Sequence, residues 1–285
     1  MNDPEVRGTL NAERLEQSFA HVLAHWGTDF PVRLIKIRQV KEYMLRRSRK
    51  GAAASTINKE RNALSKMFKI LLENELVKRN PVRETSPADE RYEQREVHIS
   101  FNDFNALMGH VPTWARVIFQ MLYFTGMRRG EALGLTWRQV NLKKRIITLG
   151  ATDTKERRPK RVPIHRVLVP MLQKIGKLRS LHDRRVFLTS RCKPPHEDSL
   201  RKPWRTAVDA IGFSPRLRIH DLRHCWKTNA MRSGMNLLIA DMIVGHGDRR
   251  KDVRAVYLTV SDNDLVREIN KMKFDIGETE IWLKK

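Results

Sequence analysis

The sequence has little of what would mark a secreted or membrane protein. Its 285 residues include only two cysteines, Cys192 and Cys225, too few and too far apart to indicate a disulfide framework. It contains no run of 18 or more apolar residues, which excludes a membrane-spanning helix. Residues 1–5 do not begin a signal peptide, because no basic stretch leads into an apolar one. These absences favour a reducing cytosol, and we expect a cytoplasmic protein without a membrane.

Acidic residues are scarce relative to basic ones. The chain has 56 Lys and Arg against 32 Asp and Glu, a net charge of +24 and a pI of about 10.6. Such an excess repels itself in a compact fold unless a polyanion screens it, so nucleic acid is the predicted partner and a membrane surface the alternative. Residues 33–69 hold twelve basic residues, and residues 128–191 hold eighteen. Two clusters suit a protein that grips a DNA duplex from two sides, although solvated helix faces would give the same composition.

The chain is long enough for two modest domains, and one polar stretch divides it. Asn80-Pro81 ends a helical pattern, and residues 84–96 are polar, contain Pro87 and lack apolar periodicity. We therefore expect a first domain at 1–84, a linker at 85–97, a second domain at 98–272 and a tail at 273–285. In the first domain the pattern predicts helices over about 11–25 and 36–49, and a third from Ser55.

The second domain mixes helices with a small sheet. Ser100, with a carboxylate three residues later, is a helix cap, and residues 114–124 form an apolar helix that leads to Thr125-Gly126. Residues 140–149 and 161–164 alternate or are β-branched around a basic tip at 152–160, which predicts a hairpin. The remainder, from about 167 to 270, is chiefly helical. The predicted fold class is mainly α with a small β-sheet.

Four short motifs followed by a tyrosine carry the chemistry. They are Thr125-Gly126-Met127-Arg128, Thr154-Lys155, His220-Asp221-Leu222-Arg223-His224 and Gly245-His246, with Tyr257 eleven residues later. Arginines can stabilise the charge of a five-coordinate phosphorus, and a tyrosine can be a covalent nucleophile. Histidine and lysine can move the protons. The set is sufficient to attack a phosphodiester without a metal or other cofactor.

These motifs and their order resemble the tyrosine recombinases of the phage integrase family. The likeness covers nearly the whole chain, and residues 125–137 are close to a family signature. It implies the fold that these enzymes share with type IB topoisomerases. It also implies six catalytic residues: Arg128, Lys155, His220, Arg223, His246 and Tyr257. The family has Leu-Gly-His where this chain has Val244-Gly245-His246, and Trp226-Lys227 stands where small or apolar residues are usual.

The resemblance assigns a role to each of these residues. Tyr257 forms a 3′-phosphotyrosyl bond while the 5′ hydroxyl leaves, and Arg128, Arg223 and His246 stabilise the transition state. His220 accepts the tyrosine proton. Lys155 protonates the leaving oxygen, with Lys160 and Lys143 on the same structure as alternatives.

Two further residues are expected to support the site. Glu131 can accept a hydrogen bond from Arg128 or a histidine, unless it is merely a helix-surface carboxylate, and His224 is expected to be buried and structural. His220 and His224, with Cys225 and His246, could alternatively bind zinc. Arg223 would put a fixed positive charge beside that metal, so we expect no metal.

Residues 55–81 resemble the core-binding domain of integrases. In that family the start of the helix lies against the major groove, which points Lys59 and Arg61 at DNA; solvated basic residues are the alternative. Because few residues precede Asn11, we expect no separate arm-binding domain. After Tyr257, either Leu265, Val266 and Ile269 or the tail is expected to contact a neighbouring subunit.

The sequence therefore predicts a site-specific DNA recombinase that integrates or excises a phage or other mobile element. Its expected partners are double-stranded DNA, a homotetramer on that DNA and accessory DNA-bending or directionality factors. The expected location is the nucleoid of a bacterial cell. A type IB topoisomerase and a non-catalytic DNA-binding relative are the alternatives, although no catalytic group is missing.

Overall fold

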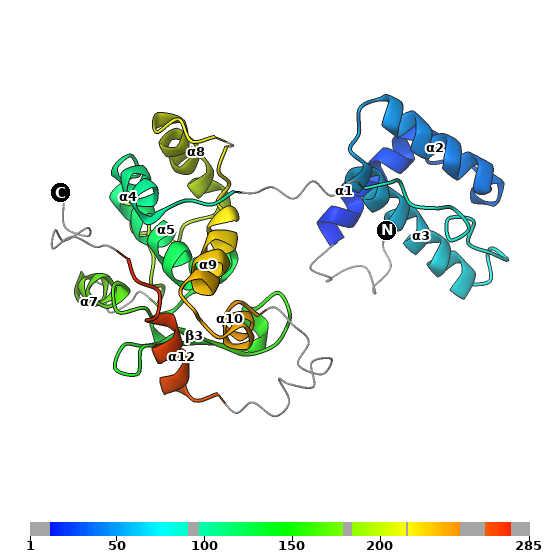
Figure 1. The fold of residues 1–285 in the computed structure, drawn as a ribbon. Coiled ribbons are helices and arrows are strands. Elements are labelled where there is room, and N and C mark those ends of the chain that lie inside the picture. The colour runs from blue at the N-terminus through cyan, green and yellow to red at the C-terminus, as the bar shows by residue number, and fades with distance from the viewer. Residues whose placement is uncertain (1–11, 91–96, 179–183, 215, 246–259, 275–285) are drawn as a thin grey trace. The chain divides into compact units, whose positions relative to one another are not determined.

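The computed structural model describes residues 12–90, 97–178, 184–214, 216–245 and 260–274. The chain divides into two compact units, Met1–Gln94 and Arg95–Lys285 (Figure 1). The division falls inside the segment that the sequence suggests as a linker. Each unit has its own hydrophobic core.

The first unit is helical. Its elements are α1 (Ala12–Trp26), the 3₁₀ helix η1 (Val32–Leu34), α2 (Ile37–Arg49) and α3 (Ala54–Glu73). The three helices expected in this region are present, but the third ends well before Asn80-Pro81. Asn74 caps it, because its side-chain amide donates to the Ile70 carbonyl at 2.8 Å, and Glu75 then takes a left-handed conformation with φ 58°.

A charged residue lies inside the core of the first unit. Glu60 on α3 is buried and accepts from the Tyr43 hydroxyl at 2.7 Å and from two Arg47 nitrogens at 2.8 and 2.6 Å. Burial alone would raise the pKa of Glu60, but these hydrogen bonds outweigh it and lower the pKa. The ionised carboxylate therefore ties α3 to α2.

The segment that follows α3 is bound to that helix. Arg61 donates to the carbonyls of Val82 and Thr85 at 2.9 and 2.5 Å, and Asn58 exchanges two hydrogen bonds with the backbone of Ala88. The expected linker start at residue 85 is therefore too early. The sequence suggested that Arg61 points at DNA. In the structure its guanidinium binds the segment that follows α3. Lys59 is exposed.

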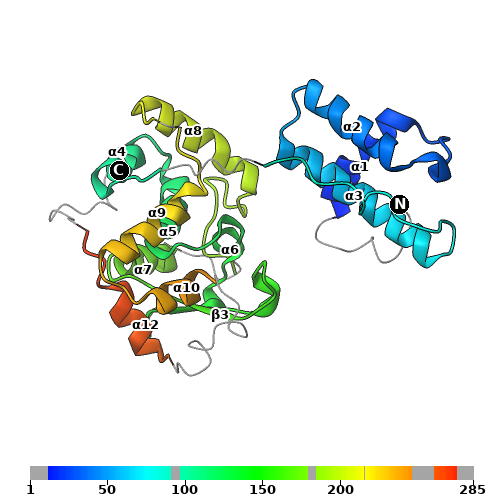
Figure 2. The same cartoon turned by 45° about the vertical axis from the view of Figure 1, so that its right-hand side comes forward.

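The second unit surrounds a buried helix. Its helices are α4 (Phe101–Gly109), α5 (Thr113–Thr125), α6 (Arg129–Gly134), α7 (Leu168–Leu178), α8 (Arg201–Ala210), α9 (Asp221–Arg232), α10 (Leu237–Val244) and α12 (Asp262–Ile269), with 3₁₀ helices η2 (Trp137–Gln139), η3 (Ala151–Asp153) and η4 (Glu197–Leu200). Helix α5 packs against α6, α7 and α9 (Figure 2). No helix among the described residues is long and apolar enough to cross a membrane.

A three-stranded antiparallel sheet lies beside these helices. Its strands are β1 (Val140–Asn141), β2 (Ile146–Leu149) and β3 (Lys160–Pro163), in that spatial order. Ile147 pairs with Val162 and Leu149 with Lys160. The predicted fold class, mainly helical with a small sheet, is confirmed. Helices α10 and α12 both contact β3, so this strand joins the late helices to the hairpin.

Helix α12 is part of the core. Leu265, Val266 and Ile269 are buried, and Phe274 packs on Phe124 with ring centroids 4.7 Å apart. The sequence allowed these three aliphatic side chains to contact a neighbouring subunit. In this structure they are buried and not available for that contact. Of the two expected contacts, only the tail remains a candidate.

Helix α5 ends at a glycine that two constraints require. Gly126 has φ 65°, and a β carbon there would lie 2.7 Å from the Trp226 ring. Trp226 is fully buried on α9 and donates its indole N–H to the Phe124 carbonyl at 3.1 Å. The unusual tryptophan after the second arginine motif thus packs α9 on the end of α5, which places the two arginine motifs side by side.

Candidate active site

Arg128 stands at the start of α6, and Glu131 fixes it there. The Glu131 carboxylate accepts from the Arg128 backbone N–H at 2.9 Å and from its guanidinium Nη1 at 3.2 Å. A carboxylate three residues into a helix commonly reaches back to the capping residue, and here it also orients that residue's side chain. Glu131 is only 5% exposed, so it is no surface carboxylate.

Lys160 is the third donor to Glu131. Its ammonium lies 2.7 Å from Glu131 Oε2, and the two side chains are 6% and 3% exposed. Burial lowers the pKa of Lys160, and the nearby charges of Arg223 and Arg128 lower it further, while Glu131 opposes the shift. Lys160 was only an alternative in the sequence, yet it lies inside the site.

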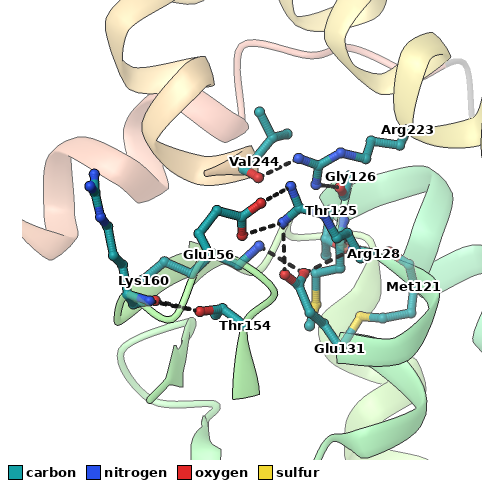
Figure 3. Close-up of polar contacts among 12 residues, drawn as sticks. Met121, Thr125, Gly126, Arg128, Glu131, Thr154, Glu156, Lys160, Arg223 and Val244 are labelled. Atoms are coloured by element: carbon teal, nitrogen blue, oxygen red, sulfur yellow. Dashed lines mark hydrogen bonds and ion pairs between the residues drawn. The ribbon is translucent and has the colours of Figure 1, made fainter. Parts of the chain in front are cut away.

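Arg223 reaches the same place from α9. It is 5% exposed and donates Nη1 to the Gly126 carbonyl at 2.7 Å and Nη2 to the Val244 carbonyl (Figure 3). Burial, followed by the charge of Arg128, lowers the pKa of Arg223 to about 10. Two backbone carbonyls thus hold the guanidinium in one direction beside Arg128.

The chain also enters the site at the end of α10. Gly245 closes this helix with φ 71°, and a β carbon there would lie 3.6 Å from Lys160 Cδ and 3.9 Å from Arg128 Nη1. His246, the next residue, and Tyr257 lie outside the described residues. The chain is held again just after them, because Arg161 donates to the Val260 carbonyl at 2.7 Å and to Asp262 at 2.6 Å.

A tight turn forms the tip between β2 and β3. The Thr154 hydroxyl donates to the Arg158 carbonyl at 2.7 Å and accepts from the Arg158 N–H at 3.1 Å. Lys155 within this turn is exposed, as is Lys143 in the preceding turn. Glu156, the next residue, forms an ion pair with Arg128. No sequence signal marked Glu156 as part of the site.

The histidine motif begins α9 instead of lying within it. His220 is the capping residue, and its ring lies 5.2 Å from the His224 ring in an edge-on arrangement. His224 is exposed, so the expectation that it is buried is wrong; the face it shares with His220 is open to solvent. Partial burial of the His220 ring, with His224 and Arg223 beside it, lowers the pKa of His220.

One of the donors considered for zinc, His246, lies outside the described residues. Among the described residues no three His, Cys, Asp or Glu side chains are grouped as metal ligands. Cys225 is buried, with its thiol 3.6 Å from the Val97 carbonyl.

Comparison with known proteins identifies the family. The model of the phage integrase family matches residues 98–263, which is more than half of the chain. The chain is a tyrosine recombinase of the phage integrase family. Among curated relatives, the tyrosine recombinase XerC of Pediococcus pentosaceus is 22% identical over 244 residues, covering 80% of each chain. The tyrosine recombinase XerD of Lacticaseibacillus casei is 22% identical over 77% of each chain.

Solved structures share the fold of the recombinase. A lambda integrase dimer bound to a core site matches with a TM-score of 0.70 at 15% identity, covering 89% of this chain and 92% of that one. The Tn1549 transposon integrase in complex with circular intermediate DNA matches with a TM-score of 0.68 at 18% identity, covering 93% and 95%.

The Lys160–Glu131 pair should be strongly coupled in stability. Lys160→Met leaves a buried carboxylate short of a donor and should cost roughly 3–5 kcal/mol of unfolding free energy. Glu131→Gln leaves a buried ammonium without its counter-charge, and the double variant should lose much less than the two single losses together. Urea unfolding of the four proteins measures this coupling.

The exposed pair of Arg129 and Glu197 provides the control. These side chains are 28% and 49% exposed, so Glu197→Gln should change the unfolding free energy by at most about 1 kcal/mol. Strictly additive losses at Lys160 and Glu131 would show that the buried pair does not act as a unit.

Proposed function

We propose that the recombinase cuts and rejoins DNA at specific sites through a 3′-phosphotyrosyl bond to Tyr257. The observation that supports it best is the meeting of Arg128 and Arg223 in one buried site, next to the point where the chain leads into His246. Two guanidiniums with planar forks suit the oxygens of one phosphate.

The two arginines are held before any substrate arrives. Glu131 orients Arg128, and two backbone carbonyls orient Arg223. Donors that are already aimed lose no reorganisation energy when charge develops on the phosphorus oxygens. His246, directly after Gly245, adds the further hydrogen bond in this proposal.

The proton transfers are assigned to His220 and Lys155. Because the pKa of His220 is lowered, its ring is neutral at neutral pH and able to accept the Tyr257 proton. Lys160 is already held by Glu131, whereas Lys155 is exposed on the hairpin tip. Lys155 is therefore the proposed donor to the departing 5′ oxygen.

The phosphotyrosyl bond conserves the energy of the broken phosphodiester, so a hydroxyl from a second strand can reverse the step without ATP or a metal. The relatives are named tyrosine recombinases, and one structural neighbour is a lambda integrase tetramer bound to a Holliday junction. We therefore propose a homotetramer on double-stranded DNA. Its proposed setting is the bacterial nucleoid, where it moves a phage or other mobile element with the help of accessory factors.

The two units divide the work in this proposal. The first, with Lys59 exposed on α3, is the core-binding domain, residues 98–272 form the catalytic domain, and residues 273–285 form the subunit contact. The basic excess of the chain supports phosphate contacts in both units.

Tyr257→Phe should bind DNA as tightly as the unaltered protein but form no covalent adduct, because the ring keeps its shape and loses its nucleophilic oxygen. The measurement is adduct mapping on genomic DNA with both proteins. Adducts gathered at one sequence support site-specific recombination, and scattered adducts with supercoil relaxation point to a topoisomerase. Adducts in the Tyr257→Phe protein would assign the nucleophile elsewhere.

His220 should set the acidic limb of the pH–rate profile. Burial and the neighbouring His224 and Arg223 hold the pKa of His220 below the ordinary histidine value, so cleavage should fall only as the pH drops through that lowered pKa. His224→Gln removes a neighbour that depresses this pKa, and the limb should move to higher pH. If His220→Gln keeps the same limb, another group is the base.

Lys155→Ala should slow cleavage of an ordinary phosphodiester by roughly 10²–10⁴, the usual range of general acid catalysis. A substrate with a 5′-bridging sulfur has a leaving group that needs no proton, so it should be cleaved nearly as fast by the variant as by the unaltered protein. Lys160→Met should slow both substrates equally, because it disturbs Glu131 and Arg128. Rescue of Lys160→Met by sulfur, without rescue of Lys155→Ala, would make Lys160 the acid.

A further inference from the structure

The carboxylate of Glu156 contacts both terminal nitrogens of the Arg128 guanidinium. Glu156 Oε2 accepts from Arg128 Nη1 at 2.8 Å, and its other oxygen pairs with Nη2. Figure 3 shows the two side chains end to end, with the Arg223 guanidinium alongside. Two parallel contacts between a guanidinium fork and a carboxylate reproduce the way such a fork binds two phosphate oxygens.

This carboxylate lies where the proposed function places the substrate phosphate. Glu156 Oε2 lies 3.8 Å from where a β carbon of Gly245 would stand, at the same place that Lys160 and Arg128 approach. Its charge also acts on Arg223, whose pKa it raises against the effects of burial and of Arg128. Glu156 thus faces the cations proposed to hold the scissile phosphate. Glu131, by contrast, supports Arg128 from within the fold.

We propose that Glu156 is a positioning residue that takes the place of the DNA phosphate on Arg128 and is displaced when the phosphate binds. This inference rests on the proposed function, since it takes Arg128 to be a phosphate ligand. Among the carboxylates of the described residues, Glu131 and Glu156 are the two that pair with Arg128, and Glu131 also pairs with Lys160. The internal carboxylate therefore balances a site that would otherwise attract any available anion.

The turn couples this exchange to the proposed acid. Thr154 closes the turn onto Arg158, so Lys155 and Glu156 are neighbours in one short bend. While Glu156 lies on Arg128, the Lys155 side chain is in solvent. At the base of the turn, Lys160 is anchored on Glu131. Displacement of Glu156 would therefore leave Lys160 in place and release the tip of the turn, where Lys155 stands next to Glu156 in sequence.

The first test measures the competition directly. Full-length protein with ¹⁵N-labelled arginine is titrated with inorganic phosphate while the Arg128 Nε signal, assigned by its loss in Arg128→Lys, is followed. Glu156→Gln keeps the shape of the side chain and removes its charge, and it should bind phosphate at Arg128 about tenfold tighter, the factor that corresponds to one charge-assisted contact of about 1.4 kcal/mol. Using the Tyr257→Phe background makes the result independent of strand cleavage.

Glu197→Gln is the matched control. Glu197 pairs with Arg129, the residue next to Arg128, so this variant makes the same change in net charge at an exposed neighbouring pair. It should leave phosphate affinity at Arg128 within twofold of the unaltered protein. Equal affinity in all three proteins, or an equal gain in both variants, would overturn the proposal.

The second test uses the duplex identified by adduct mapping. In single-turnover cleavage, Glu156→Gln should reach half-maximal rate at a lower DNA concentration, with a maximal rate at least as high as that of the unaltered protein. A catalytic or structural role for the Glu156 carboxylate predicts the opposite, a fall in the maximal rate, and that result would overturn the proposal. If, in the first test, neither the unaltered protein nor any variant binds phosphate at Arg128, the result would count against the proposed function.

Discussion

The buried carboxylate of Glu131 is the constraint on which the site depends. It receives the Arg128 backbone N–H, the Arg128 guanidinium and the Lys160 ammonium. A single buried anion is costly unless all its acceptor positions are used, and here two cations use them. The same contacts define the start of α6 and the direction of Arg128. They also hold Lys160, the first residue of β3, against α6. The arrangement of the cations at the proposed phosphate site thus depends on the same buried ion pairs that stabilise the fold.

Strand β3 extends this arrangement in two directions. Successive side chains of a strand point to opposite faces, so Lys160 reaches Glu131 while Arg161 reaches Val260 and Asp262. One face of the strand holds the arginine site, and the other holds the chain where it returns to α12 after Tyr257. Between β2 and β3 lies the turn with Lys155 and Glu156. The elements assigned to phosphate binding, proton donation and return of the tyrosine segment therefore share one short strand.

Helix α5 provides the second support. Its end at Gly126 accepts both the Trp226 ring and an Arg223 hydrogen bond. Since Arg128 follows Gly126 by two residues, packing one indole on one glycine brings two arginines from distant parts of the sequence to the same proposed phosphate site. The tryptophan departs from the usual family pattern, yet it contributes to the alignment of the site.

Local patterns in the sequence were sufficient for most of the secondary structure. Apolar periodicity predicted the three helices of the first unit, and the cap at Ser100, the apolar run to Phe124 and the hairpin of β2 and β3 also appear as expected. Two expectations about single side chains differ from what the structure shows, because local patterns do not reveal which contacts a side chain makes. Arg61 was expected at DNA but holds Val82 and Thr85, and His224 was expected inside the protein but lies at the surface.

The sequence by itself determined the family and indicated a set of candidate reacting groups, because the order and chemical types of the motifs can be read without coordinates. The resemblance favoured Lys155 over Lys160, but the sequence could not show what either side chain contacts, since both lie on the same hairpin. Tertiary packing decided that Lys160 is enclosed with Glu131 and that Lys155 stays in solvent. It also brought Glu156 onto Arg128, 28 residues away in sequence. The partners of these charged side chains lie on different elements, so the ion pairs form only when α6, β3 and the turn before it have packed together.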